Sequence, residues 1–137
     1  MYYKFEEKNR MEIPEPFHRY ITPIYMGDES KECAEAGFSV HMTEWPKGGQ
    51  VDEHSHPAST EVMFCIAGHG KCYLEGEEYD FVPGSMIAAG PGVVHKIVND
   101  HDELLRAVCI FSPPNTASGL RGRAMDAKEK DDEENGR

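Results

Sequence analysis

Three histidines and one glutamate stand at spacings that suit a metal site, namely His54, His56, Glu61 and His95. On an extended strand, residues two apart face one side with Cα atoms about 6.5 Å apart, so both imidazoles can reach one ion at about 2.1 Å. The short link 57–60 lets the chain turn a corner before Glu61 directs its carboxylate to the same space. Imidazole and carboxylate together suit Mn, Fe(II), Co, Ni, Cu or Zn rather than Ca or Mg. We therefore predict one divalent transition metal, whose identity the spacing leaves open.

The elements that position these side chains are predicted to be short strands. Residues 38–111 hold short runs rich in Val, Ile, Phe and Tyr, which glycine and proline interrupt at close spacing. That pattern is typical of an all-β sandwich or barrel. We count about seven candidate strands and expect a hairpin formed by 71–75 and 78–82 around Gly76. No part of this span has helical periodicity over helix length, which excludes a parallel α/β sheet.

Two spaced motifs in this span resemble those of the cupin family. The first reads Gly48, five residues, His54-x-His56, four residues, Glu61, six residues, Gly68, and its stretch from His54 to Glu61 resembles the germin type. The second motif is matched by Gly84, Gly92, His95 and Asn99, with one departure: Gly90 stands where the family has a proline, and proline follows as Pro91. The resemblance covers about residues 38–111.

The resemblance implies a double-stranded β-helix, or jelly-roll barrel, in agreement with the short-strand pattern. It also implies that His54, His56, Glu61 and His95 are the metal ligands. Cupins of this size are commonly dimers, and an extended arm ahead of a barrel can add a strand to a neighbour's sheet edge. We therefore expect a homodimer.

Strand alternation extends the predicted site. If Glu61 faces the lumen, Met63 and Cys65 face it too, and Ile97 and Asn99 share a face with His95. We expect Cys65 to be a buried, inert thiol and Asn99 to hold backbone near a turn. His41 alternates with Phe38, Val40 and Met42; if those face the core, His41 faces outward. A mostly apolar lumen suits a small organic ligand.

The flanking regions differ from the barrel. Residues 1–37 are polar and punctuated by proline, which favours an N-terminal arm of short extended segments rather than a helix. Residues 113–137 form a polar, charged C-terminal tail whose last dozen residues contain no aromatic or branched aliphatic side chain, and we expect it to be solvated. Arg121 and Arg123 either lie in a solvated loop or, if the tail folds over the barrel mouth, clamp a substrate carboxylate.

Composition limits the partners and the compartment. The chain has 137 residues, which fits one domain, and 14 basic against 25 acidic residues give a net charge of −11. This charge repels phosphate backbones and anionic lipids, so we expect neither nucleic acid nor a membrane as partner. No apolar run is long enough to span a bilayer, and the first residues do not resemble a secretory signal. We expect a cytoplasmic protein with four free thiols.

The predicted function is a metal-dependent cupin that acts on a small, oxygen-rich organic molecule as an oxygenase, isomerase or lyase. The same family fold serves enzymes and non-catalytic proteins alike. The alternative is therefore a small-ligand binding or sensing cupin with a structural metal. No motif places a general base in the lumen, so no catalytic side chain is assigned. The number of metal-coordination positions left open distinguishes the two functions.

Overall fold

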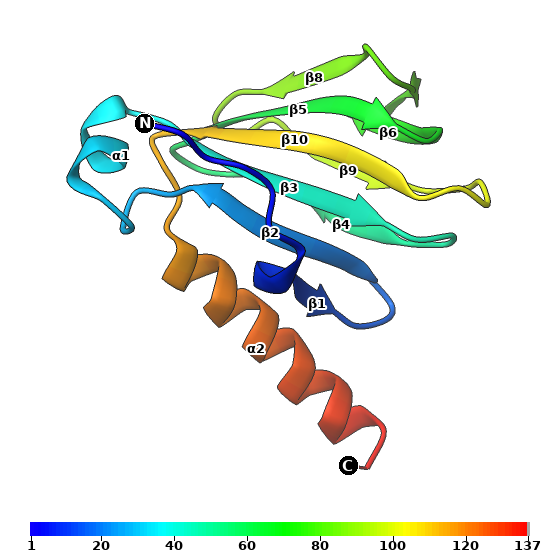
Figure 1. Cartoon of the computed structure of the whole chain (residues 1–137). Coiled ribbons are helices and arrows are strands. Elements are labelled where there is room, and N and C mark those ends of the chain that lie inside the picture. Colours follow the sequence, from blue (N-terminus) through cyan, green and yellow to red (C-terminus); the bar gives the residue numbers. More distant parts are fainter. Residues whose placement is uncertain (137) are drawn as a thin grey trace.

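Two antiparallel β-sheets form the body of the protein in the computed structural model, which describes residues 1–136 (Figure 1). The six-stranded sheet has the order β1-β2-β3-β10-β5-β8, and the four-stranded sheet has the order β4-β9-β6-β7. The strands are β1 Met11–Ile13, β2 Arg19–Tyr25, β3 Ser39–Trp45, β4 Gln50–His54, β5 Thr60–Ala67, β6 Gly70–Leu74, β7 Glu77–Phe81, β8 Met86–Ala89, β9 His95–Val98 and β10 Leu105–Ser112.

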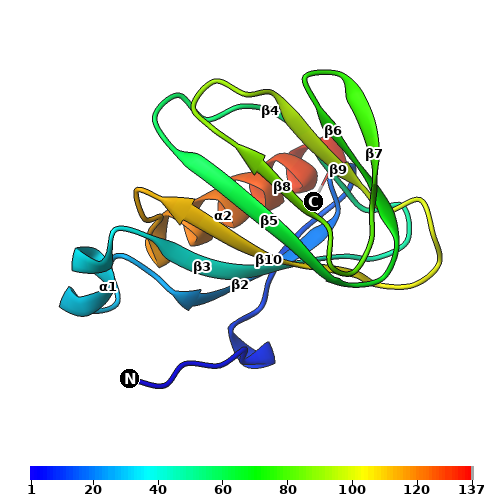
Figure 2. The same ribbon diagram turned by 90° about the horizontal axis from the view of Figure 1, so that it is seen from above.

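The main core lies between the two sheets because each strand turns alternate side chains inward. On β10, Leu105, Ala107, Cys109 and Phe111 are buried, while the residues between them are partly exposed. Facing residues of the four-stranded sheet, such as Ile97, complete the cluster. Seen from above, the four-stranded sheet stands apart from the six-stranded one, as in a jelly roll (Figure 2). The all-β prediction is confirmed.

Turns fall where glycine and proline interrupt the sequence. The predicted hairpin is present: β6 pairs with β7 from Gly70 opposite Phe81 to Leu74 opposite Glu77. Gly68, between β5 and β6, has φ of +86°, and a Cβ there would lie 2.5 Å from the carbonyl oxygen of Leu104. Only glycine fits that conformation and that approach. Residues 38–112 contain eight strands, close to the number expected.

The N-terminal region joins the same chain's sheet. β1 pairs with β2, and β2 pairs with β3, so this region extends the six-stranded sheet by two strands. It also contains a 3₁₀ turn, Glu7–Asn9, and a short helix, α1, over Lys31–Ala36, where only extended segments were predicted. The Ser30 side chain caps α1 by accepting a hydrogen bond from the Cys33 amide at 3.1 Å.

The C-terminal region differs from the expected solvated tail, because residues Ala117–Glu134 form a helix, α2. Its first half packs Ala117, Leu120 and Ala124 against Ile13 and Ile21 of β1 and β2. The second half, from about residue 126, is charged and largely exposed, as the sequence predicts. Figure 1 shows α2 running beside β1 and β2.

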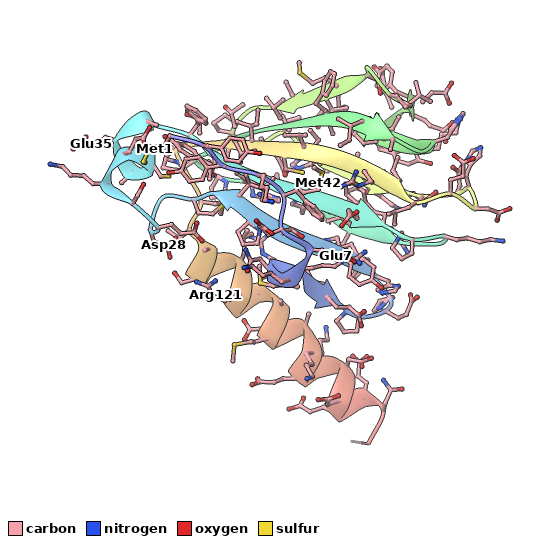
Figure 3. The ribbon with its side chains drawn as sticks, viewed as in Figure 1. Met1, Glu7, Asp28, Glu35, Met42 and Arg121 are labelled. Atoms are coloured by element: carbon pink, nitrogen blue, oxygen red, sulfur yellow. The ribbon has the colours of Figure 1, made fainter. Side chains whose placement is uncertain are left out.

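Long-range hydrogen bonds fix the start of α2. The Asp28 carboxylate, in the loop after β2, accepts hydrogen bonds from the amides of Ala117 at 2.6 Å and Ser118 at 3.1 Å. Thr116 adds a local cap by accepting from the Gly119 amide at 3.0 Å. Figure 3 shows Asp28 beside the first turn of α2. Within residues 1–136, no helix is both long and apolar enough to cross a membrane.

Candidate metal centre

Three strand ends bring the four predicted ligands together. His54 is the last residue of β4 and stands opposite His95, the first residue of β9, while Glu61 lies at the start of β5. His56 follows β4, and its carbonyl accepts a hydrogen bond from the Gly92 amide at 2.8 Å, which joins the two motifs. One potential ligand atom from each of the four residues lies within 4.8 Å of all the others.

The departure from the family pattern at Gly90 leaves this arrangement in place. The turn before His95 closes with a hydrogen bond from the Val93 amide to the Gly90 carbonyl at 3.1 Å. Gly92 has φ of +79°, in the left-handed region that glycine adopts without cost. The turn therefore places His95 in the cluster although Gly90 stands where the family has a proline.

Backbone carbonyls fix the tautomers of two imidazoles. His54 Nδ1 lies 2.7 Å from the Asp52 carbonyl, and His95 Nδ1 lies 2.9 Å from the Val93 carbonyl. A carbonyl only accepts hydrogen bonds, so each Nδ1 carries the proton and donates it. The Nε2 atoms of both rings are left for the centre of the cluster. Such partners orient the histidine ligands of metal sites.

Glu61 is the shared acceptor of the cluster. His95 Nε2 lies 2.8 Å from Glu61 Oε1 and donates to it when the ring is protonated on both nitrogens, and His56 Nε2 donates to the same oxygen at 3.2 Å. Burial alone would raise the pKa of Glu61, but these hydrogen bonds outweigh it and hold the pKa at about 2. The buried side chain is therefore a carboxylate at neutral pH, ready to bind a cation.

The histidine pKa values move in opposite directions. Burial lowers the pKa of His54 more than the Asp52 carbonyl raises it. Burial also lowers the pKa of His95, but the hydrogen bonds to Glu61 and Val93 together raise it above its ordinary value. Both shifts favour a protonated His95 ring beside an ionised Glu61 carboxylate.

A narrow lumen cavity of about 30 Å³ lies beside the cluster. That volume holds little more than one or two water molecules. Met63 lines it as predicted, and Cys65 is buried in the core, where burial raises the pKa of its thiol. A larger hollow of about 620 Å³ lies under the N-terminal segment and contains none of the four residues. The lumen is lined by His54, His56, Glu61, Met63, Arg19, Ile21, His41, Thr43, Trp45, Val51, Phe111 and Arg123.

His41 faces this lumen, and the expectation that it faces outward is wrong. Its side chain is only 4% exposed, its ring stacks on Phe111 at a centroid distance of 5.8 Å, and its Nδ1 has no hydrogen-bond partner. Burial lowers the pKa of His41 to about 4, so the ring is neutral at pH 7. Its ligand atoms also lie within 4.8 Å of those of Glu61 and Cys109. Trp45, four residues on and on the same face of β3, lines the same lumen.

Asn99 holds backbone, as predicted. Its side-chain amide donates to the carbonyls of Trp45 and Glu103, each at 2.8 Å, and its side-chain oxygen accepts from the His101 amide at 3.0 Å. Its own amide donates to the Gly49 carbonyl at 2.8 Å. These bonds join the loops at the ends of β3 and β9.

Two arginines complete the lumen wall. Arg123 on α2 lines the cavity, whereas Arg121 lines the separate hollow under the N-terminal segment. Arg19, at the start of β2, also lines the lumen, and the sequence analysis did not select it. Its only sequence signal is that it stands two residues before the buried Ile21, on the same face of the strand.

Comparisons with known proteins agree with this geometry. A sequence model of the cupin domain matches residues 41–111. The chain is 34% identical over 90 residues to L-ectoine synthase of Bordetella petrii, covering 58% of this chain and 60% of that enzyme. It is 25% identical over 89 residues to quercetin 2,3-dioxygenase of Bacillus subtilis, covering 65% of this chain and 24% of that enzyme. The chain thus spans about 60% of the length of the ectoine synthases it matches.

Among solved structures, ectoine synthase from P. lautus superposes with a TM-score of 0.65 at 22% identity, covering 82% of this chain and 76% of that chain. At that identity the superposition establishes the fold alone. The two curated relatives carry names of different chemistry, a synthase and a dioxygenase. Chemistry must therefore be argued from the side chains themselves.

Proposed function

The chain belongs to the cupin family, and on that premise we propose that it is a metal-dependent enzyme acting on a small, oxygen-rich organic molecule. In this proposal His54, His56, Glu61 and His95 bind one divalent transition metal. Names of relatives point to oxygen chemistry in one case and to a synthase in another, so an oxygenase, an isomerase or a lyase are the reaction types to test.

One observation carries the proposal: three imidazoles and an ionised carboxylate converge within 4.8 Å, and two of the rings are already oriented through Nδ1. This donor set fits Mn, Fe(II), Co, Ni, Cu or Zn. When bound, such a metal supplies Lewis-acid polarisation of a substrate oxygen or a binding place for dioxygen.

The remaining lumen residues provide the setting for that chemistry. Trp45, Met63 and Phe111 give an apolar wall that leaves almost no room for bulk water. His41 contributes a neutral ring with one unpartnered nitrogen, which is available to hydrogen-bond a polar group of a bound molecule. Thr43 is engaged with Cys109 at 3.4 Å. We infer that His41 is a substrate-positioning residue.

The small free volume of the lumen favours one second candidate, a non-catalytic ligand-binding or sensing cupin with a structural metal. A structural metal is closed by its protein ligands, whereas a catalytic one keeps a position for water or substrate. Water exchange at the metal therefore separates the two candidates.

The test uses full-length protein reconstituted separately with Fe(II), Mn, Co, Ni, Cu and Zn. We expect exchangeable water on the bound ion, measured by Mn(II) proton relaxation, and turnover in either an oxygen-uptake or a keto-acid isomerisation screen. The His95→Asn variant removes one ligand and abolishes turnover, while the variant His69→Asn, at a partly exposed histidine outside the cluster, leaves it unchanged. Absence of turnover together with absence of exchangeable water would overturn the enzyme proposal in favour of the binding module.

We also propose that the protein is a homodimer. Exposed apolar side chains gather on the outer face of the six-stranded sheet, where Phe64 of β5 pairs with Met86 of β8 at exposures of 41% and 56%. Ile66 and Phe38 are exposed as well. A second copy would cover this face. Light scattering at micromolar concentration should give a dimer mass that Phe64→Ser/Met86→Ser reduces to a monomer; a monomeric wild type would contradict the proposal.

We place the protein in the cytoplasm. All four cysteines are buried and free, which suits a reducing compartment. Fractionation of the native host with an antibody to the protein should recover it with cytoplasmic enzymes.

A further inference from the structure

Two spaces meet under α2. The lumen cavity of about 30 Å³ contains the candidate ligands, and a groove of about 380 Å³ lies between α2 and the loop that joins β1 to β2. Arg19 and Arg123 line both spaces. The two arginines therefore lie between the groove and the lumen cavity, at what we call the arginine junction.

Arg19 is buried without a directly paired carboxylate. The residue is 7% exposed, and within residues 1–136 its one hydrogen bond runs from Nη1 to the Phe17 carbonyl at 2.8 Å. Burial, together with the charge of Arg123, lowers the pKa of Arg19 to about 10, so the group still carries its charge at neutral pH. Arg123 is exposed on α2 and has no hydrogen bond or ion pair with any residue of 1–136.

Neither guanidinium has a direct ion-pair partner in the described part of the chain, although acidic residues outnumber basic ones by 25 to 14. Within residues 1–136, no carboxylate oxygen lies within 4.0 Å of either group. The groove is also lined by four carboxylates that stay beyond that distance, those of Glu15, Asp52, Asp131 and Glu134. Asp52 and Glu61 act on Arg19 only through longer-range attraction. Two neighbouring cations at a partly dry site are unfavourable until an anion joins them.

Guanidinium groups match the geometry of carboxylate and phosphate oxygens, which they bind through paired hydrogen bonds. We propose that Arg19 and Arg123 together bind the anionic oxygen group, carboxylate or phosphate, of a small-molecule substrate at the mouth of the lumen. This inference rests on the proposed function, because it supplies the substrate class for the same site. The reactive end of that molecule then enters the lumen toward His41 and the ligand cluster, and the remainder occupies the groove.

The chain offers a matched control two residues away. Arg121 is on the same helix and carries the same charge, but it projects away from the lumen into the hollow under the N-terminal segment (Figure 3). Replacing Arg121 or Arg123 by Gln removes one charge from the same surface helix in each case. A difference between the two variants therefore reports the position of the charge and not its loss.

The experiment is calorimetric titration of full-length protein from which metal has been stripped with a chelating resin. The probes are succinate, inorganic phosphate and the neutral analogue succinamide. We expect saturable binding of at least one anion and none of succinamide. Arg123→Gln should weaken anion binding by about 10–100-fold, the loss of one charged hydrogen-bonding group, while Arg121→Gln stays within about twofold. The anion that binds more tightly identifies the substrate's charged group.

Arg19→Lys keeps a charge in the buried position but loses the planar fork, so it should also weaken anion binding. Thermal unfolding without anion checks that each variant folds. No saturable anion binding by the wild type, equal binding of succinamide, or equal losses in the Arg121 and Arg123 variants would each overturn the inference. The anion titration contains no metal, so it tests this inference separately from the proposed function. A protein that binds the anion here but takes up no metal on reconstitution would overturn the proposed function alone. A protein that takes up metal but binds no anion would overturn this inference alone.

Discussion

The ligand cluster and the arginine junction differ in how they satisfy their charges. In the cluster, Glu61 accepts hydrogen bonds from His56 and His95, and backbone carbonyls hold the other ring nitrogens of His54 and His95. At the junction, two guanidiniums stand together without a carboxylate partner among residues 1–136. The cluster is organised before any ligand arrives, whereas the junction is completed only by an anion.

The two regions also differ in where their residues come from. The cluster lies wholly within residues 41–111, the span that matches the cupin domain, while the junction is built from β2 and α2 outside it. In our proposals, the shared domain binds the metal and the flanking elements of this chain control what reaches it. Each prediction below perturbs one region, and the last also measures whether the other responds.

The largest effect is expected from Glu61→Gln. Loss of the only carboxylate among the four candidate ligands should lower transition-metal affinity by at least about 100-fold, since even partners behind the ligands are worth 10–100-fold. Competition against a chromophoric chelator measures it. Glu53→Gln, at an exposed carboxylate on β4, is the matched control and should keep wild-type affinity. Wild-type affinity in Glu61→Gln would remove the carboxylate from the site.

A pH effect on stability is expected from His41. Its folded pKa of about 4 lies below the ordinary value of 6.5, so folding favours the neutral ring. The stabilisation is complete above pH 6.5 and is lost as pH falls toward 4, amounting to about 3 kcal/mol over that range.

Urea unfolding of metal-free wild type and His41→Gln between pH 7 and 4 measures this term. The wild-type free energy of unfolding should fall relative to the variant as the medium becomes acidic. If the free energies of unfolding of wild type and His41→Gln change in parallel with pH, His41 titrates normally and is not enclosed in the lumen.

The smallest of the three effects is expected from Leu120→Ala on α2. Leu120 is buried against β1 and β2, and its truncation should cost about 2 kcal/mol, the low end for a buried leucine in a small cluster. Metal affinity should not change, because α2 contributes none of the four ligands. Chemical denaturation and metal titration check both statements, with the exposed Met125→Ala as control. A loss of metal affinity would show that the two regions are coupled.

The parts of the cluster that the residue pattern predicts are those with local geometry, whereas the meeting of Glu61 with His95, 34 residues apart, was expected from the family resemblance. The His54-x-His56 spacing sits at one strand end, and Gly68 and Gly92 occupy turns whose positive φ values require glycine. Strand alternation correctly placed Met63, Ile97 and Asn99 on the inner faces. Each of these predictions depends on a few neighbouring residues.

His41 was misplaced because β3 is covered on both sides. Met42 and Thr43 are both buried, as are His41 and Trp45, so alternation along this strand does not reveal which face lines the lumen. Anchoring the alternation on Phe38 failed, because Phe38 lies outside the strand and is exposed.

The sequence did not predict α2 for a different reason: the residues that stabilise this helix are remote from it in sequence. Only four apolar residues of α2 pack on the sheet, three alanines and one leucine, and the cap comes from Asp28, 89 positions before Ala117. A charged segment with so little apolar surface does not signal a docked helix. Arg19 and Arg123 meet only because β2 and α2 pack together, which no spacing rule anticipates.

The most direct test of the central claim is the metal content of tag-free protein, measured by mass spectrometry after reconstitution. We predict about one transition-metal ion per chain in the wild type, and none in His54→Ala/His56→Ala. The control is His69→Ala/His101→Ala, which removes two rings stacked at 4.0 Å outside the cluster, one partly exposed and one exposed, and should retain the ion. Protein that takes up no metal, or a His54→Ala/His56→Ala variant that holds as much as the wild type, would contradict the account.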